Sequence, residues 1–167
     1  MMGKSFALPL LAVFICVADQ VSKIYMTSIL EIGQSIEVIP GYFNFTLVMN
    51  PGAAFGLFAN LPSTIRRILL GVVTAVAMTL VILLLRKEAK EDQLAKIALF
   101  MVIGGAVGNL IDRFRYDAVV DFLDVYWGSY HWPAFNIADS AISIAVVILL
   151  LRFAIKPAVN NSESELS

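Results

Sequence analysis

The chain has 167 residues, of which 59% are hydrophobic and 15% are charged, with a formal net charge of −1 and a mean hydropathy of +0.83. Soluble domains are about 25% charged, so the composition indicates a membrane protein and gives no sign of nucleic-acid binding. Cys16 is the only cysteine and His131 the only histidine. They exclude a disulfide framework within the chain and argue against a histidine-based metal or haem site, so no metal or other cofactor is expected.

Four segments of the chain are apolar over nearly the length needed to cross a membrane. A crossing helix needs about 20 residues to span the hydrocarbon core, and the backbone inside that core must satisfy its own hydrogen bonds, which favours helices. The sequence therefore predicts a membrane α-helical fold with four transmembrane helices. The expected spans are residues 6–30, 65–85, 94–111 and 135–153.

The first span also has features of a secretory signal peptide, because Lys4 precedes the apolar run. That run is long for a signal peptide and no small-x-small cleavage site closes it, so we expect a retained helix. Residues 1–158 are expected to form one integral membrane domain. The polar residues 159–167 are expected to form a disordered tail.

The basic residues predict the orientation of the spans. With four spans, both termini share a side with the loop at residues 86–96, and this side carries seven basic residues against five on the other. The positive-inside rule therefore predicts cytoplasmic termini. It puts two longer loops, residues 31–63 and 112–133, on the outer side.

The first outer loop has the pattern of two strands around a turn. β-Branched and aromatic residues alternate with polar ones in residues 35–39 and 42–48, and Pro40-Gly41 between them is typical of a turn. This pattern suits a small sheet on the membrane surface. The second outer loop is rich in aromatic residues, which favour the headgroup level, so we expect a surface helix or loop there.

Polar residues interrupt or end two of the predicted spans. Asp19 and Lys23 are four residues apart, which is a favourable spacing for an ion pair on one helix face; a structural pair and a direct chemical role are both open. Asn109, Asp112 and Arg113 end the third span. Asp112 is expected to pair with Arg113 or with a cation of another helix, and Arg113 to form a planar fork to a carboxylate or to position a substrate.

Asp121 and Asp139 are the two most informative residues. Each lies beside a membrane-length apolar segment, and an ionisable group at membrane depth is a functional-site hypothesis by default. From the residues alone, three functions remain open. The pair can be a catalytic dyad that shares one proton, part of a proton pathway in a small transporter, or structural groups of a non-catalytic membrane subunit.

Five motifs stand in a fixed order along the chain, and together they resemble the bacterial lipoprotein signal peptidase (signal peptidase II) family. Pro51 is a departure, because the family usually has a small polar residue after the loop asparagine. The motifs are Asp19–Lys23, Asn50–Phe55, Gly104–Arg113, Val119–Phe122 and Phe135–Ser140.

The resemblance implies an intramembrane aspartyl endopeptidase with four transmembrane helices, a small periplasmic β-sheet cradle at about residues 31–63 and a periplasmic surface helix or loop at about residues 112–133. Its implied substrates are prolipoproteins whose cysteine carries diacylglycerol, and the signal peptide is removed just before that cysteine. The implied location is the bacterial inner membrane, with both termini cytoplasmic and the site at the periplasmic face. Membrane lipids are the other expected partners, the chain is expected to be a monomer, and globomycin is expected to inhibit it.

The resemblance also assigns roles to individual residues. The catalytic aspartates fall on Asp121 and Asp139, and Asp19 with Lys23 is expected to be a structural ion pair. The residues expected to line or support the site are Asn50, Gly52, Gly104, Asn109, Asp112, Arg113, Asn136 and Ala138.

Overall fold

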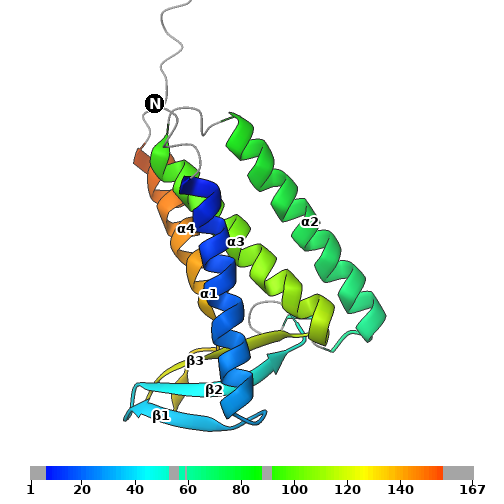
Figure 1. The fold of residues 1–167 in the computed structure, drawn as a ribbon, viewed down its shortest axis with the longest axis vertical. Coiled ribbons are helices and arrows are strands. Elements are labelled where there is room, and N and C mark those ends of the chain that lie inside the picture. Colours follow the sequence, from blue (N-terminus) through cyan, green and yellow to red (C-terminus); the bar gives the residue numbers. More distant parts are fainter. Residues whose placement is uncertain (1–6, 53–56, 59, 88–91, 156–167) are drawn as a thin grey trace, which may run out of the picture.

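Four long helices rise from one side of a small antiparallel sheet (Figure 1). This computed structural model describes residues 7–52, 57–58, 60–87 and 92–155. All four predicted helices are confirmed, and their observed ends differ from the predicted ends by a few residues. They are α1 (Ala7–Ile29), α2 (Ser63–Lys87), α3 (Gln93–Tyr116) and α4 (Ile137–Ile155).

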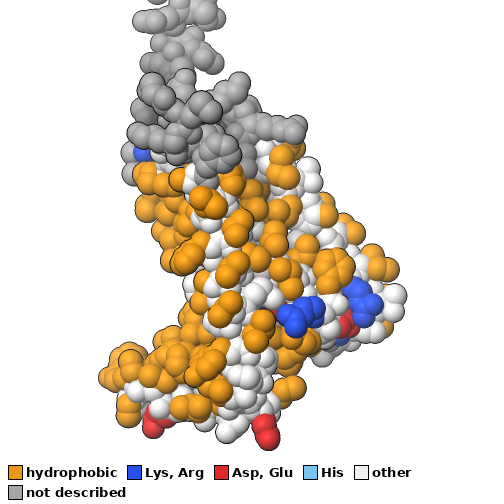
Figure 2. Space-filling view, viewed as in Figure 1, with side chains coloured by type: hydrophobic (Ala, Val, Ile, Leu, Met, Phe, Trp, Pro, Cys, Tyr) orange, Lys and Arg blue, Asp and Glu red, His pale blue; other side chains and the backbone are white. Residues whose placement is uncertain are grey.

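Helix α3 is the centre of the bundle. It packs against α1, α2 and α4, while α1 also packs against α4, and α2 stands to one side (Figure 1). By length and composition, α1, residues 63–83 of α2, and α3 can each cross a membrane. Apolar side chains cover much of the bundle surface (Figure 2), as expected for helices that have lipid as their solvent.

Helix α4 is the fourth predicted span, and its crossing of the membrane stays a prediction. It has 19 residues, close to the roughly 20 residues that a span needs. Large apolar side chains are exposed along it, among them Ile144, Val147 and Leu150.

The sheet has four strands in the order β1-β2-β3-β4, all antiparallel. The predicted hairpin is confirmed, and Gly41 between its strands has a φ of +83°, a left-handed conformation that glycine adopts without strain. The strands are β1 (Ser35–Ile39), β2 (Phe43–Asn50), β3 (Val119–Trp127) and β4 (Tyr130–His131).

The prediction of a surface helix or loop at residues 112–133 is wrong. Helix α3 continues to Tyr116, and β3 then pairs along β2 with Asp121 opposite Val48. The first half of β3 is buried on both faces, with Val120 and Phe122 as well as Asp121 enclosed. Its sequence therefore lacks the alternation of apolar and polar residues that marks a half-exposed strand. In addition, its partner strand β2 is distant in the chain, as the pairing of Asn50 with Val119 shows.

The sheet is fixed to the bundle by a hydrophobic cluster at the end of α1. Met26 and Leu30 pack there against Leu47 of β2 and against Val120 and Phe122 of β3, and all five side chains are buried. Burial of this kind contributes about 1.5–3 kcal/mol for each large side chain. Because Val120 and Phe122 flank Asp121, the same cluster fixes the position of that carboxylate relative to the helices.

Candidate active site

A cavity of about 870 Å³ lies between the sheet and the adjoining parts of α3 and α4. Asp121 enters its wall from β3, and Asp139 enters from the first turn of α4. Asn109 and Arg113 of α3 and Asn50 of β2 are further polar residues of the wall. The two aspartates that the sequence singled out therefore line one cavity.

Asp121 is a buried carboxylate whose neighbours are amides. Only 2% of the residue is exposed, and its two oxygens accept hydrogen bonds from Nδ2 of Asn50 at 3.1 Å and Nδ2 of Asn136 at 2.7 Å. Burial, followed by the negative charge of Asp139, raises the pKa of Asp121 from 3.8 to about 7. The hydrogen bonds from the two asparagines act in the opposite direction and favour the ionised form.

Two asparagine side chains connect the aspartates. Asn136 donates from Nδ2 to Oδ1 of Asp121 at 2.7 Å and to Oδ1 of Asn109 at 3.2 Å, and Asn109 donates from its own Nδ2 to Oδ1 of Asp139 at 2.8 Å. Asn136 also precedes α4 and accepts, through Oδ1, a hydrogen bond from the backbone N–H of Asp139 at 2.9 Å. This is the geometry of a helix N-cap, so the residue that begins α4 also sets the positions of both carboxylates.

A buried charge cluster lies behind this wall. Lys23 of α1 pairs with Asp19 at 2.7 Å, which confirms the predicted ion pair, and it also pairs with Asp112 of α3 at 2.7 Å. Its Nζ donates to Oδ1 of Asn109 at 2.9 Å as well. One lysine thus faces two carboxylates, and the cation that pairs with Asp112 comes from another helix.

The carboxylates of this cluster reach both structural elements that carry Asp121 and Asp139. Asp112 accepts a hydrogen bond from the backbone N–H of Val120 at 3.1 Å, and Asp19 accepts one from the backbone N–H of Ala138 at 2.9 Å. Val120 and Ala138 are the residues immediately before Asp121 and Asp139. The cluster therefore fixes the backbone immediately before each of the two aspartates.

Arg113 closes another side of the cavity. Its Nη2 donates to the backbone oxygen of Gly52 at 3.2 Å, and Gly52 donates its own N–H to the Asn50 side chain at 3.0 Å. We expected Arg113 to form a planar fork to a carboxylate or to position a substrate. Among the described residues, no ion pair between Arg113 and a carboxylate is observed. Arg113 instead ties α3 to the loop that follows β2.

The comparisons with known proteins identify the family. The model of the signal peptidase (SPase) II family matches residues 11–155. The chain belongs to the signal peptidase II family. It is similar to proteins named lipoprotein signal peptidase from Syntrophus aciditrophicus, with 48% identity over 80% of this chain and 83% of the relative, and from Maridesulfovibrio salexigens, with 41% identity over 91% and 97%. A solved bacterial membrane enzyme superposes with a TM-score of 0.83 at 32% identity, covering 98% of this chain and 96% of that one.

Family membership confirms the resemblance inferred from the five motifs. The structure divides the residues that were expected to line or support the site into two groups. Asn50, Asn109 and Arg113 line the cavity with the two aspartates. The others do not line it, and all of them are buried. This second group comprises Gly52, Gly104, Asp112, Asn136 and Ala138.

Glycines of the family motif on α3 act through close packing. A Cβ on Gly104 would lie 2.6 Å from the backbone oxygen of Ala12 on α1, and a Cβ on Gly105 would lie 2.6 Å from the backbone oxygen of Ala138 on α4. A Cβ on Gly108 would meet the Asp19 carboxylate at 2.6 Å. These contacts let α1 and α4 approach α3 closely enough for the buried polar groups to meet.

Sequence reasoning missed most of the apolar cavity wall. Ser143 lies four residues after Asp139, and Ile144 lies four residues after Ser140, so helical spacing alone would have placed each of them on the face of its predecessor in α4. The segment before α4 gave no comparable signal, because its backbone is irregular. The unpredicted lining residues are Val48, Met49, Pro51, Val119, Trp132, Pro133, Ala134, Phe135, Ser140, Ser143 and Ile144.

Proposed function

We propose that this protein is an intramembrane aspartyl endopeptidase of the bacterial inner membrane. It removes the signal peptide from diacylglyceryl-modified prolipoproteins by cutting just before the lipidated cysteine. The observation that carries the proposal is the pair of aspartates on one cavity wall, Asp121 and Asp139, joined through the amides of Asn136 and Asn109. Membership of the signal peptidase II family supports the same activity.

The chemistry follows from one proton shared by two carboxylates. With the pKa of Asp121 at about 7, the pair holds a single proton near neutral pH. The ionised carboxylate takes a proton from a water molecule, and the protonated carboxylate donates its proton to the carbonyl oxygen as the water oxygen attacks the carbonyl carbon. The resulting gem-diol collapses when the leaving nitrogen receives a proton, and the C–N bond breaks.

The surroundings of the pair suit a peptide with lipid attached. Phe135 and Ile144 give the cavity an apolar wall beside the carboxylates, and Ile144 belongs to the exposed apolar surface of α4. The diacylglyceryl chains stay in the bilayer while the scissile bond enters between Asp121 and Asp139. This arrangement needs one copy of the chain, so the enzyme acts as a monomer.

Replacing either aspartate tests the proposal directly. Asp121→Asn and Asp139→Asn keep the shape of the side chain and remove its acid–base function. Each is expected to lower kcat by about 10²-fold to 10⁴-fold, measured by the gel shift of a diacylglyceryl-modified precursor after incubation with purified enzyme. Globomycin is expected to block the wild-type reaction.

The matched control is Asp124→Asn. Asp124 lies on the same strand, is buried, accepts a hydrogen bond from Asn44 at 3.0 Å and contacts His131, but it does not line the cavity. It should keep near wild-type turnover. Normal processing by either dyad variant would refute the mechanism, and proton flux in proteoliposomes without cleavage would support a transporter instead.

A further inference from the structure

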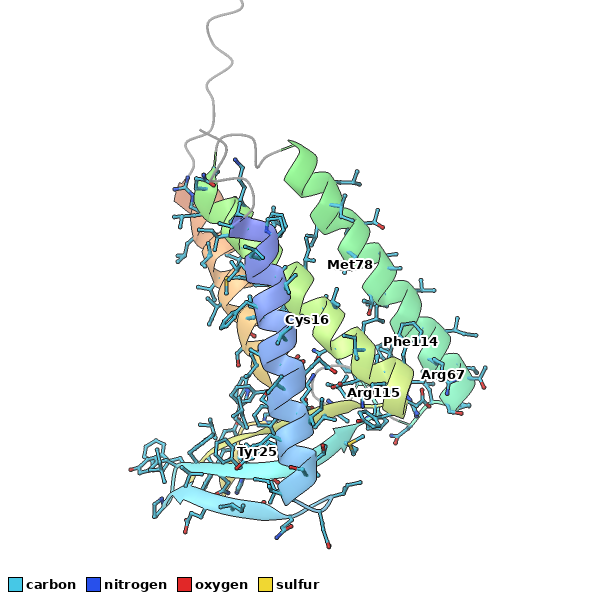
Figure 3. All side chains as sticks on the ribbon, in the orientation of Figure 1. Cys16, Tyr25, Arg67, Met78, Phe114 and Arg115 are labelled. Carbon is cyan, nitrogen blue, oxygen red and sulfur yellow. The ribbon has the colours of Figure 1, made fainter. Side chains whose placement is uncertain are left out.

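A second, smaller cavity lies between α2 and α3 and is not explained by peptide cleavage. Its volume is about 70 Å³. At its mouth are arginines of both helices, two of them from the unusual Arg66-Arg67 pair at the start of α2. Figure 3 shows Arg67 on α2 and Phe114 with Arg115 on α3, at the ends of the two helices nearest the sheet.

The mouth of this groove carries more positive than negative charge. Arg66 and Arg67 both pair with the same carboxylate, Asp117, at 3.3 Å and 3.0 Å. The Arg67 side chain is 65% exposed, and Arg113 of α3 also lines the cavity. Three arginines therefore line it against one carboxylate, and Figure 2 shows basic side chains here beside apolar surface.

The base of the groove is apolar. Leu70 and Gly71 of α2 face Leu110 and Phe114 of α3 across it. A Cβ on Gly71 would find no atom within 4 Å, so space is open where the two helices separate. Phe114 is 81% exposed, as expected for an aromatic side chain at the level of the lipid headgroups.

We propose that this groove between α2 and α3 binds an anionic phospholipid. The headgroup phosphate accepts hydrogen bonds from Arg66 and Arg67, and one acyl chain begins over Leu70 and Gly71. Guanidinium groups bind phosphate strongly, and the net positive charge of the mouth selects an anionic lipid over a zwitterionic or neutral one. The proposal rests on the position of the two helices in the membrane and not on the peptidase chemistry.

The groove and the catalytic cavity share part of their walls. Pro51 and Arg113 line both of them, and Arg113 is the residue that holds the backbone of Gly52. A lipid in the groove therefore packs against the back of the wall that faces the dyad.

Lipid binding can be measured without any peptidase assay. Purified protein in detergent micelles is titrated with phosphatidylglycerol, phosphatidylcholine, diacylglycerol or inorganic phosphate, and thermal unfolding and native mass spectrometry report stabilisation and retained lipid. Phosphatidylglycerol alone should raise the unfolding temperature and be retained. Arg66→Gln and Arg67→Gln should each weaken its apparent affinity about fivefold, while Gly71→Leu should abolish retention by filling the groove.

The control variants separate this site from general charge effects. Arg152→Gln removes an arginine that pairs with Asp92 at 2.7 Å at the opposite end of the bundle, and Gly71→Ala adds a side chain too small to fill the groove. Both should bind phosphatidylglycerol as the wild type does. Equal stabilisation by phosphatidylcholine or diacylglycerol, reproduction of the effect by inorganic phosphate, or full retention by Gly71→Leu would each overturn the proposal.

Discussion

At the scale of single residues, Asp121 sets the pH range in which the proposed dyad operates. Its pKa rises from 3.8 to about 7 because burial and the charge of Asp139 disfavour the carboxylate. The folded state therefore binds this proton more tightly than the unfolded chain does. Binding of this proton contributes to the free energy of unfolding. The contribution is fully present below about pH 4 and is lost as the pH rises through about 7.

The same shift predicts the alkaline limit of activity. The shared proton is present below about pH 7 and is lost above it, so kcat should fall as the pH rises through that value. Asn50→Ala removes the 3.1 Å hydrogen bond that favours the carboxylate of Asp121. Its alkaline limb should therefore move to higher pH, by up to about one unit, in a pH profile of precursor cleavage.

Asn44→Ala is the matched control for this experiment. Asn44 and Asn50 both lie on β2 and both donate to an aspartate of β3, but Asn44 reaches Asp124 outside the cavity. Its pH profile should coincide with that of the wild type. An unshifted limb in Asn50→Ala would contradict the assignment of this limb to Asp121.

At the scale of secondary-structure elements, the close contact between α3 and α4 determines where Asp139 lies. Gly105 faces the backbone oxygen of Ala138, and Ala138 donates its N–H to Asp19 at 2.9 Å. The start of α4 is thus held on one side by helix packing and on the other by the buried charge cluster. Any side chain at Gly105 must push this part of α4 away.

Gly105→Ala should consequently lower both stability and turnover. Its Cβ would lie 2.6 Å from the backbone oxygen of Ala138, and relieving the clash moves Asp139 relative to Asp121. We expect a loss of about 1–3 kcal/mol in the free energy of unfolding together with reduced kcat. Thermal unfolding and precursor cleavage measure the two effects.

Gly71→Ala provides the comparison on α2, where a Cβ meets no atom within 4 Å. Alanine is the better helix former, so this variant should be as stable as the wild type or slightly more so. A Gly105→Ala protein with unchanged unfolding temperature and unchanged turnover would show that this contact is not needed to position Asp139.

At the scale of the whole molecule, the sheet and the first and last described residues lie at opposite ends of the bundle. The starts of α1 and α3 and the end of α4 are on one side, and the sheet with the dyad is on the other (Figure 1). Arg152 of α4 pairs with Asp92 on the side away from the sheet. Together with the positive-inside rule, this arrangement predicts that the sheet faces the periplasm.

Cysteine labelling tests this orientation in a Cys16→Ala background. Ser129→Cys lies in the exposed turn between β3 and β4 and should react with a membrane-impermeant maleimide in intact spheroplasts. A cysteine at position 167 should react only after lysis, because both termini are expected in the cytoplasm. Labelling of the tail before lysis, with Ser129→Cys protected, would reverse the orientation.

Local patterns in the sequence were enough to predict the helices, the β1–β2 hairpin, the Asp19–Lys23 pair and the importance of Asp121 and Asp139, which line one cavity. These depend on local composition and spacing, such as apolar runs of membrane length and an i,i+4 ion pair. Three features could be seen only in the folded chain: β3 is a strand, Lys23 pairs with two carboxylates, and Asn136 and Asn109 connect Asp121 to Asp139. Each of these depends on partners far apart in the chain, and contacts of that kind leave no periodic signal in the sequence.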